Sequence, residues 1–210
     1  MQIQHLRATP SLAQRQFRLP HGLVGRLAGW FMARENRRLN RMAIDWLEVE
    51  PDDDVLEIGF GPGHGIALLA EQTAARSIAG VDPSAEMVHQ ASARNQTAVA
   101  AGRVSLVLGT VAALPFPDAS FSRVVVVSNF HIWPSRADGV QEIYRVLAAG
   151  GRFVICVRLA LREPWPWSSP GVSTEQLHRD EALLRKQGFS HVQRATRKHR
   201  RRSVCLVATK

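Results

Sequence analysis

The chain has 210 residues, of which 45% are hydrophobic and 21% charged, and its net charge is +9. This length and composition are typical of one globular domain with a short appendage, and they exclude a wholly disordered chain. No apolar run reaches the roughly 18 residues of a membrane span, and the first residues lack the apolar stretch of a signal peptide.

The positive charge gathers at the two ends of the chain. Residues 1–46 carry a net charge of +6 and residues 185–210 one of +9, which leaves −6 for the centre. A surface built for nucleic acid would not leave the centre acidic, so the charge argues against nucleic acid as the partner. Cys156 and Cys205 lie in apolar, strand-like runs, which predicts reduced core thiols in a cytoplasmic protein.

A helical pattern runs over residues 22–48. Its apolar positions recur every three or four residues, at Val24, Ala28, Phe31, Met32, Leu39, Met42, Ala43 and Trp46. We therefore predict an N-terminal helical extension over residues 1–50. Its arginines lie largely on the other face, and three interpretations stay open: a helix packed on the domain, a contact with an anionic membrane surface, or a lid over a small-molecule site.

After Pro51 the pattern alternates between strands and helices. We predict strands at 54–60, 76–82, 103–109, 121–129 and 152–159, helices at 64–74, 84–101, 139–148 and 173–187, and a final strand, basic turn and strand. Such alternation is typical of an α/β fold. The prediction for residues 51–210 is a Rossmann-like, doubly wound, seven-stranded sheet, mostly parallel, with a C-terminal antiparallel hairpin.

Three glycines, Gly59, Gly61 and Gly63, stand between the first strand and the first helix of this domain. Glycine at that place lets the backbone turn sharply and come close to a ligand. The spacing is GxGxG, and His64 stands where the dinucleotide pattern GxGxxG needs its last glycine. Pro62 also removes a backbone donor that a pyrophosphate would use.

An acidic residue, Asp82, follows Gly61 by 21 residues, at the tip of the next predicted strand. A carboxylate there can accept hydrogen bonds from both hydroxyls of a ribose. The alternative is that Asp82 serves only at the start of a helix. Together with the glycines, it indicates a ligand that contains adenosine and lacks phosphates.

Four blocks in the correct order now resemble one family. VLEIGFGPGHG, VDPSAEM, GTVAALPFPDASFS and EIYRVLAAGGRFVI are similar to the motifs of class I S-adenosylmethionine-dependent methyltransferases that act on small molecules such as quinones, sterols and natural products. The matches extend from about residue 52 to residue 158. The resemblance implies S-adenosyl-L-methionine as cofactor and a small-molecule acceptor as substrate.

The resemblance also implies roles for individual residues. Glu57 and the backbone from Gly59 through Phe60 and Gly61 to Gly63 would face the methionine part of the cofactor. The remaining predicted cofactor contacts are Asp82 at the ribose, Pro83 and Met87 on the adenine, Thr110 and Val111 at its edge, and Asn129 beside the sulfonium.

Two positions depart from the family pattern. Thr110 stands where many relatives have an aspartate that accepts from the adenine amino group, which implies modest cofactor affinity. Ser122 replaces another usual aspartate, and we expect this change to concern the fold.

The acceptor is expected above the end of the fourth strand, at residues 128–134. His131 is the candidate catalytic base, or alternatively a histidine that caps a turn. Phe130, Trp133 and Trp165 are candidate walls of the acceptor pocket, or alternatively packing residues. No metal site is predicted.

Three functions stay open on the sequence. The first is methyl transfer to O, N or C of a small organic acceptor. The second is a membrane-associated lipid or quinone methyltransferase. The third is a non-catalytic homologue that binds the cofactor, or binds RNA through the basic cluster at 194–202.

Overall fold

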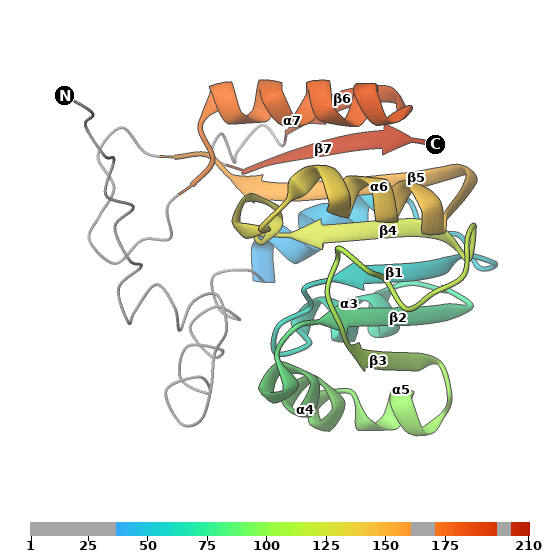
Figure 1. The fold of residues 1–210 in the computed structure, drawn as a ribbon. Helices are drawn as coiled ribbons and strands as arrows, with labels where there is room; N and C mark the ends of the chain where they lie inside the picture. The colour runs from blue at the N-terminus through green and yellow to red at the C-terminus, as the bar shows by residue number, and fades with distance from the viewer. Residues whose placement is uncertain (1–36, 161–170, 197–202) are drawn as a thin grey trace.

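A seven-stranded sheet runs through the protein in the order β3-β2-β1-β4-β5-β7-β6 (Figure 1). The computed structural model describes residues 37–160, 171–196 and 203–210. The strands are β1 Asp54–Ile58, β2 Ser77–Asp82, β3 Val104–Leu108, β4 Phe121–Val127, β5 Leu147–Arg158, β6 Ser190–Ala195 and β7 Ser203–Thr209. β1 to β5 pair in parallel, whereas β7 is antiparallel to both β5 and β6. The predicted mostly parallel sheet with a C-terminal antiparallel hairpin is confirmed.

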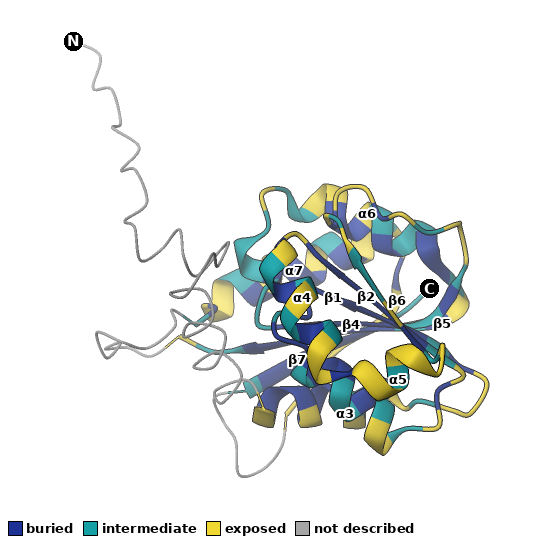
Figure 2. Ribbon diagram, turned by 90° about the horizontal axis from the view of Figure 1, so that it is seen from below, coloured by how far each residue is buried: buried dark blue, intermediate teal, exposed yellow. Residues whose placement is uncertain are grey.

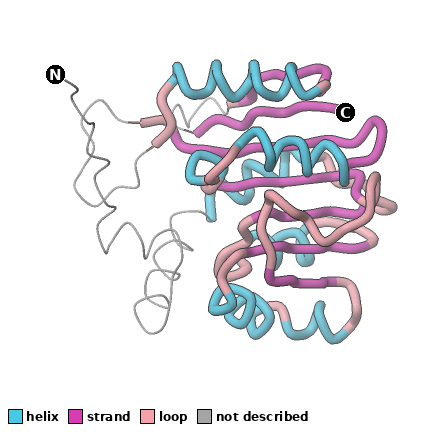
Figure 3. The backbone as a smooth tube through the Cα atoms, viewed as in Figure 1, coloured by secondary structure: helices cyan, strands magenta, loops and turns pink. Residues whose placement is uncertain are grey.

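Helices cover both faces of this sheet (Figures 1 and 3). They are a helix at 37–47, α3 His64–Gln72, α4 Ala85–Arg94, α5 Gln96–Ala100, the short 3₁₀ helix η1 Phe130–Ile132, α6 Arg136–Val146 and α7 Thr174–Gln187.

The core consists of two apolar clusters, one on each face of the sheet. One cluster joins Leu56 of β1 to Ile143 of α6 and Leu184 of α7. The other joins Val55 of β1 to Ile66 of α3 and to the helix at 37–47. Neighbouring residues of β1 thus belong to opposite faces, as the two-residue period of a strand requires. In Figure 2 the inner strands are buried, while α5 shows an exposed outer side.

The helix at 37–47 is part of the second cluster. Leu39, Met42 and Leu47 expose 2% or less of their surface, whereas Arg38 and Arg41 are exposed. This confirms the predicted apolar and basic faces for the described part of the helix. The pattern before residue 37 lies outside the described residues, so the division of the chain at residue 50, the lid and the membrane contact stay predictions.

Two predicted elements differ from the structure. The helix expected at 84–101 is divided into α4 and α5, because Asn95 donates its side-chain amide to carbonyls of Gly63 and Ala91. The helix expected at 139–148 starts at residue 136, where Ser135 caps it, and ends at residue 146. β5 begins directly afterwards and includes Gly150, whose φ of +75° few other residues adopt without strain.

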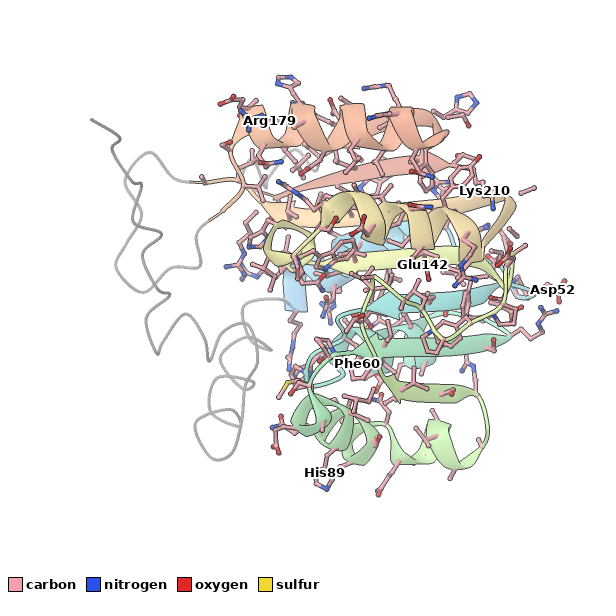
Figure 4. The ribbon with its side chains drawn as sticks, in the orientation of Figure 1. Asp52, Phe60, His89, Glu142, Arg179 and Lys210 are labelled. Atoms are coloured by element: carbon pink, nitrogen blue, oxygen red, sulfur yellow. The ribbon has the colours of Figure 1, made fainter. Side chains whose placement is uncertain are left out.

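Ser122 lies at the amino end of β4. Its hydroxyl donates to Asp53 Oδ1 at 2.6 Å and accepts from the N–H of Asp54 at 3.1 Å. These bonds join β4 to the start of β1, at the edge where Asp52 also lies (Figure 4). Ser122 therefore stabilises the fold at that edge.

Cys156 and Cys205 lie directly opposite each other on β5 and β7, and both are buried and free. The prediction that they are core thiols is confirmed. Among the described residues, no helix has the length and apolar character needed to span a membrane.

The helix at 37–47 should contribute to global stability. We expect Met42→Ala to lower the free energy of unfolding by about 2–5 kcal/mol, because it leaves a cavity in a closed cluster. The matched control is Arg41→Ala on the exposed face, expected to change it by less than about 0.5 kcal/mol. Urea unfolding followed by circular dichroism measures both. Equal, small effects would mean that this helix is not docked in solution.

Candidate functional site

The carboxyl ends of the parallel strands meet at one edge of the sheet. β1 pairs with β2 on one side and with β4 on the other, so the connections after β1 and β4 lead away in opposite directions. Ligands of open α/β sheets bind in the crevice that forms at such a point. In Figure 4, Phe60 marks this end of β1 and Asp52 marks the opposite end.

The turn after β1 needs glycine for two separate reasons. Gly59, Gly61 and Gly63 all have positive φ, of +69°, +54° and +80°. A Cβ on Gly59 would lie 2.4 Å from Nδ2 of Asn129, and one on Gly63 would lie 2.6 Å from Cβ of Ala91. A Cβ on Gly61 would meet no described atom within 4 Å. Gly61 is therefore where the turn faces open space, and a ligand can approach its backbone there.

Arg94 at the end of α4 and Asn95 directly after it bind the backbone of this turn. Nε of Arg94 donates to the carbonyl of Pro62 at 2.8 Å, and Nδ2 of Asn95 donates to that of Gly63 at 3.2 Å. Sequence reasoning missed both residues. They are 32 positions away from their partners, and no local pattern indicates the contact.

Asp82 is held in a fixed orientation at the end of β2. Its two carboxylate oxygens accept one backbone N–H each, from Gly61 at 2.9 Å and from Ser84 at 2.9 Å. Each oxygen keeps a further lone pair, which is what the two hydroxyls of a ribose need. Burial raises the pKa of Asp82, and the hydrogen bonds from Ser84 and Gly61 oppose that rise.

The four residues predicted to contact the adenine differ in how far they are exposed. Pro83 and Thr110 are exposed, whereas Met87 and Val111 expose only 2% and 9% of their surface. The two exposed residues can contact a ligand as they stand.

Although Phe60 lies in the glycine turn, its side chain does not face the ligand-binding edge. Its ring packs over Gly80 of β2, 2.6 Å from where a Cβ would stand, and it belongs to the second apolar cluster. The ring therefore supports the turn from inside, and only the backbone of Phe60 faces the edge.

Glu57 is a buried acid beneath the same turn. It exposes 3% of its surface, and among the described residues its Oε2 has no hydrogen-bond partner. Its carboxylate lies against Gly65 of α3, and Asn40 and Ile44 of the helix at 37–47 line the same small space. Burial first, and Asp82 second, raises the pKa of Glu57 to about 8.

His64, the first residue of α3, is half-buried. Burial first, then the nearby guanidinium groups of Arg94 and Arg37, lowers the pKa of His64 to about 4. The imidazole is therefore neutral at pH 7, at the start of the helix.

Asn129 follows β4 and reaches across to the glycine turn. Its Nδ2 donates to the carbonyls of Ile58 at 2.9 Å, Gly59 at 3.0 Å and Val127 at 3.3 Å. Its Oδ1 accepts the indole N–H of Trp133 at 2.9 Å. Ser128, just before it, has a left-handed φ of +60°, which few residues other than glycine adopt.

The segment predicted to face the acceptor consists of η1 and the residue after it. Phe130 exposes 1% of its surface, and its ring lies 4.8 Å from that of Trp133, which itself packs on Gly139 of α6. His131 is partly buried, and its Nδ1 has no partner among the described residues. Trp165 lies outside the described residues.

The imidazole of His131 is kept uncharged. Burial first, and Arg136 second, lowers the pKa of His131. Arg136 starts α6 and is held by Asp180 of α7, with Nη1 and Oδ1 3.1 Å apart. A neutral imidazole with one free ring nitrogen can accept a proton or a hydrogen bond.

A family model described as "Methyltransferase domain" matches residues 56–155. YdaC of Bacillus subtilis, an uncharacterized methyltransferase, is 33% identical over 132 residues, which are 63% of this chain and 71% of YdaC. The chain belongs to the class I S-adenosylmethionine-dependent methyltransferases.

A second relative and a solved structure similar to this chain are also described as methyltransferases. The ubiquinone/menaquinone biosynthesis C-methyltransferase UbiE of Geotalea daltonii is 30% identical over 121 residues, 57% of this methyltransferase and 52% of UbiE. The methyltransferase thus spans about half the length of that relative. Among solved structures, a putative S-adenosyl-L-methionine-dependent methyltransferase of Methanococcus maripaludis has the same fold, with a TM-score of 0.70, 21% identity, and coverage of 88% and 92% of the two chains.

The residues present fit the family's cofactor, S-adenosyl-L-methionine. An amino group can donate to the unpartnered Oε2 of Glu57, whose pKa a cationic group beside it would lower, and the oriented carboxylate of Asp82 suits a ribose. Beside the Gly61 N–H that binds Asp82, the open side of Gly61 lets a ligand approach the backbone. The methyltransferase would hold the cofactor between these two acids.

Glu57 should make stability depend on pH. Its folded pKa of about 8 exceeds the ordinary value of 4.5, so the folded state keeps a proton that the unfolded state loses. Stability therefore falls as pH rises from about 4.5 to about 8, by about 1.4 kcal/mol per pH unit from this group. Glu57→Gln should remove that slope, so its advantage over the native protein should grow from pH 5 to pH 8.

Urea midpoints at several pH values measure this effect. Glu71→Gln, on the exposed side of α3, makes the same change of charge and should leave the slope in place. Identical slopes for Glu57→Gln and the native protein would contradict the burial of this acid.

Proposed function

We propose that this methyltransferase transfers the methyl group to an O, N or C atom of a small, uncharged, apolar or aromatic acceptor. The observation that carries the proposal is the composition of the acceptor side. Between residues 128 and 134, the only ionisable side chain is His131, whose pKa is lowered, and its neighbours are Phe130, Ile132 and Trp133. An acceptor with a fixed charge would find no counter-charge in this segment.

Methyl transfer needs little from the protein beyond the correct placement of cofactor and acceptor. S-adenosyl-L-methionine, when bound, supplies a methyl group that is already activated by its positive sulfur. The glycine turn and Asp82 orient the adenosine part, and Glu57 pairs with the amino group. Bringing the reacting atoms into line and excluding water then account for most of the rate.

A proton must leave the acceptor when the attacking atom carries one. His131, a partly buried imidazole in the segment predicted to face the acceptor, is the side chain proposed to take it. Because its pKa is lowered, His131 is already unprotonated at neutral pH and needs no activation. The proposed products are the methylated acceptor, S-adenosylhomocysteine and a proton.

A quinone-type aromatic ring is a second candidate acceptor. It is favoured by the similarity to UbiE, whose name describes C-methylation in ubiquinone and menaquinone biosynthesis. Arg37, Arg38 and Arg41 are exposed on the helix at 37–47 and would suit a lipid surface that carries such a substrate.

Transfer of a labelled methyl group into extracts of the source cells tests the acceptor class. The extract is separated into lipids, water-soluble small molecules, RNA and protein, and labelled products are identified by mass spectrometry. We expect the label in a small molecule with an apolar or aromatic acceptor group. A label in the lipid fraction alone would select the quinone candidate, and a label confined to RNA or protein would contradict the proposal.

His131 should affect turnover and leave cofactor binding unchanged. With an acceptor that must lose a proton, His131→Asn should lower kcat by about 10²-fold, because the proton loses its acceptor. The native rate should begin to fall only below the ordinary histidine pKa of 6.5, since burial and Arg136 lower the pKa of His131. His89→Asn, on the exposed side of α4 (Figure 4), is the matched control. Unchanged kcat in His131→Asn would assign His131 to packing.

A further inference from the structure

The carboxamide of Asn129 has no group left for a ligand on its nitrogen. An amide nitrogen carries two hydrogens, and here they serve the carbonyls of Ile58, Gly59 and Val127. The amide oxygen accepts the indole N–H of Trp133. Asn129 therefore binds the protein's own backbone at the point where the family resemblance places a contact with the sulfonium.

Trp133 fixes which way the amide faces. The indole can only donate, so the amide must present its oxygen to Trp133 and its nitrogen to the glycine turn. The reverse orientation would bring the amide oxygen against three carbonyl oxygens and leave the indole N–H unpaired. Each error costs a partly buried hydrogen bond.

The bonded groups lie on both sides of the reaction site. On the cofactor side, Gly59 approaches so closely that a Cβ would stand 2.4 Å from Nδ2 of Asn129. On the acceptor side, the ring of Trp133 packs against Phe130 of η1 and against Gly139 of α6. The glycine turn, Asn129, Trp133 and η1 thus form one continuous set of contacts.

We propose that Asn129 and Trp133 are a pair of positioning residues that fix the cofactor-binding turn relative to the acceptor-binding segment. Asn129 acts through the carbonyls of Ile58 and Gly59 rather than by touching the sulfonium. Cofactor binding at the turn is transmitted to Trp133, and so to the segment that carries His131. The acceptor-binding role of that segment rests on the proposed function.

Asn129→Asp separates this role from direct contact with the sulfonium. A carboxylate cannot donate to the three carbonyls, so the proposal predicts that affinity for S-adenosylmethionine and for S-adenosylhomocysteine falls together, by about tenfold or more. Direct contact between residue 129 and the sulfonium predicts instead that the two affinities diverge. A carboxylate would favour the cationic S-adenosylmethionine over the neutral product. Calorimetric titration with both ligands decides. A shift of the affinity ratio towards S-adenosylmethionine, or no change in either affinity, would overturn the proposal.

Trp133→Phe is a milder variant that keeps the ring and removes the N–H. We expect affinity for S-adenosylhomocysteine to fall by about threefold to tenfold. Trp46→Phe is the matched control, because Nε1 of Trp46 is buried without a partner among the described residues. It should leave the affinity unchanged. Equal effects of the two variants would contradict a role for the indole hydrogen bond.

The indole N–H itself gives a direct signal. In protein labelled with ¹⁵N-tryptophan, the resonance lost in Trp133→Phe belongs to Trp133. It should shift during titration with S-adenosylhomocysteine, and Asn129→Ala should abolish the shift while the ligand still saturates the protein. A Trp133 resonance that does not shift when ligand binds to the native protein would overturn the proposal. Because no acceptor is needed, this result is independent of the acceptor class and of His131.

Discussion

The contact between Gly59 and Asn129 is the constraint on which the rest of the site depends. It lets the turn after β1 lie directly against Asn129, two residues after the end of β4, with no side chain between them. Asn129 then binds the carbonyls at the end of β1, and Gly61 is left facing open space. A side chain at Gly59 would separate β1 from β4 at the edge where cofactor and acceptor must meet.

Two buried acids give this edge its chemical character. Asp82 is oriented by two backbone N–H groups, whereas Glu57 keeps an unpartnered oxygen and a raised pKa. The difference suits two parts of one ligand: a ribose needs a fixed acceptor, and a cationic amino group placed beside Glu57 would lower its pKa and make it a counter-charge. His64 and His131 stay neutral because burial and nearby arginines lower the pKa of each.

The sequence predicts the order of strands and helices because strand and helix periods and glycine punctuation are local signals. It also predicts Gly59, Gly61, Gly63 and Asp82 at one edge, since parallel strands end together. It does not predict the inward amide of Asn129, whose partners lie 70 and 71 residues away. The division of one expected helix at Asn95 has the same cause, a hydrogen bond to Gly63 made only in the folded chain.

The central claim is that this edge binds adenosine through Asp82 without a phosphate site. Calorimetric titration of the native protein and of Asp82→Ala with S-adenosylhomocysteine and with NAD tests it most directly. We expect the native protein to bind S-adenosylhomocysteine and not NAD, and Asp82→Ala to lose at least about tenfold in affinity. Binding of NAD alone, or equal affinity of the two proteins for S-adenosylhomocysteine, would contradict it.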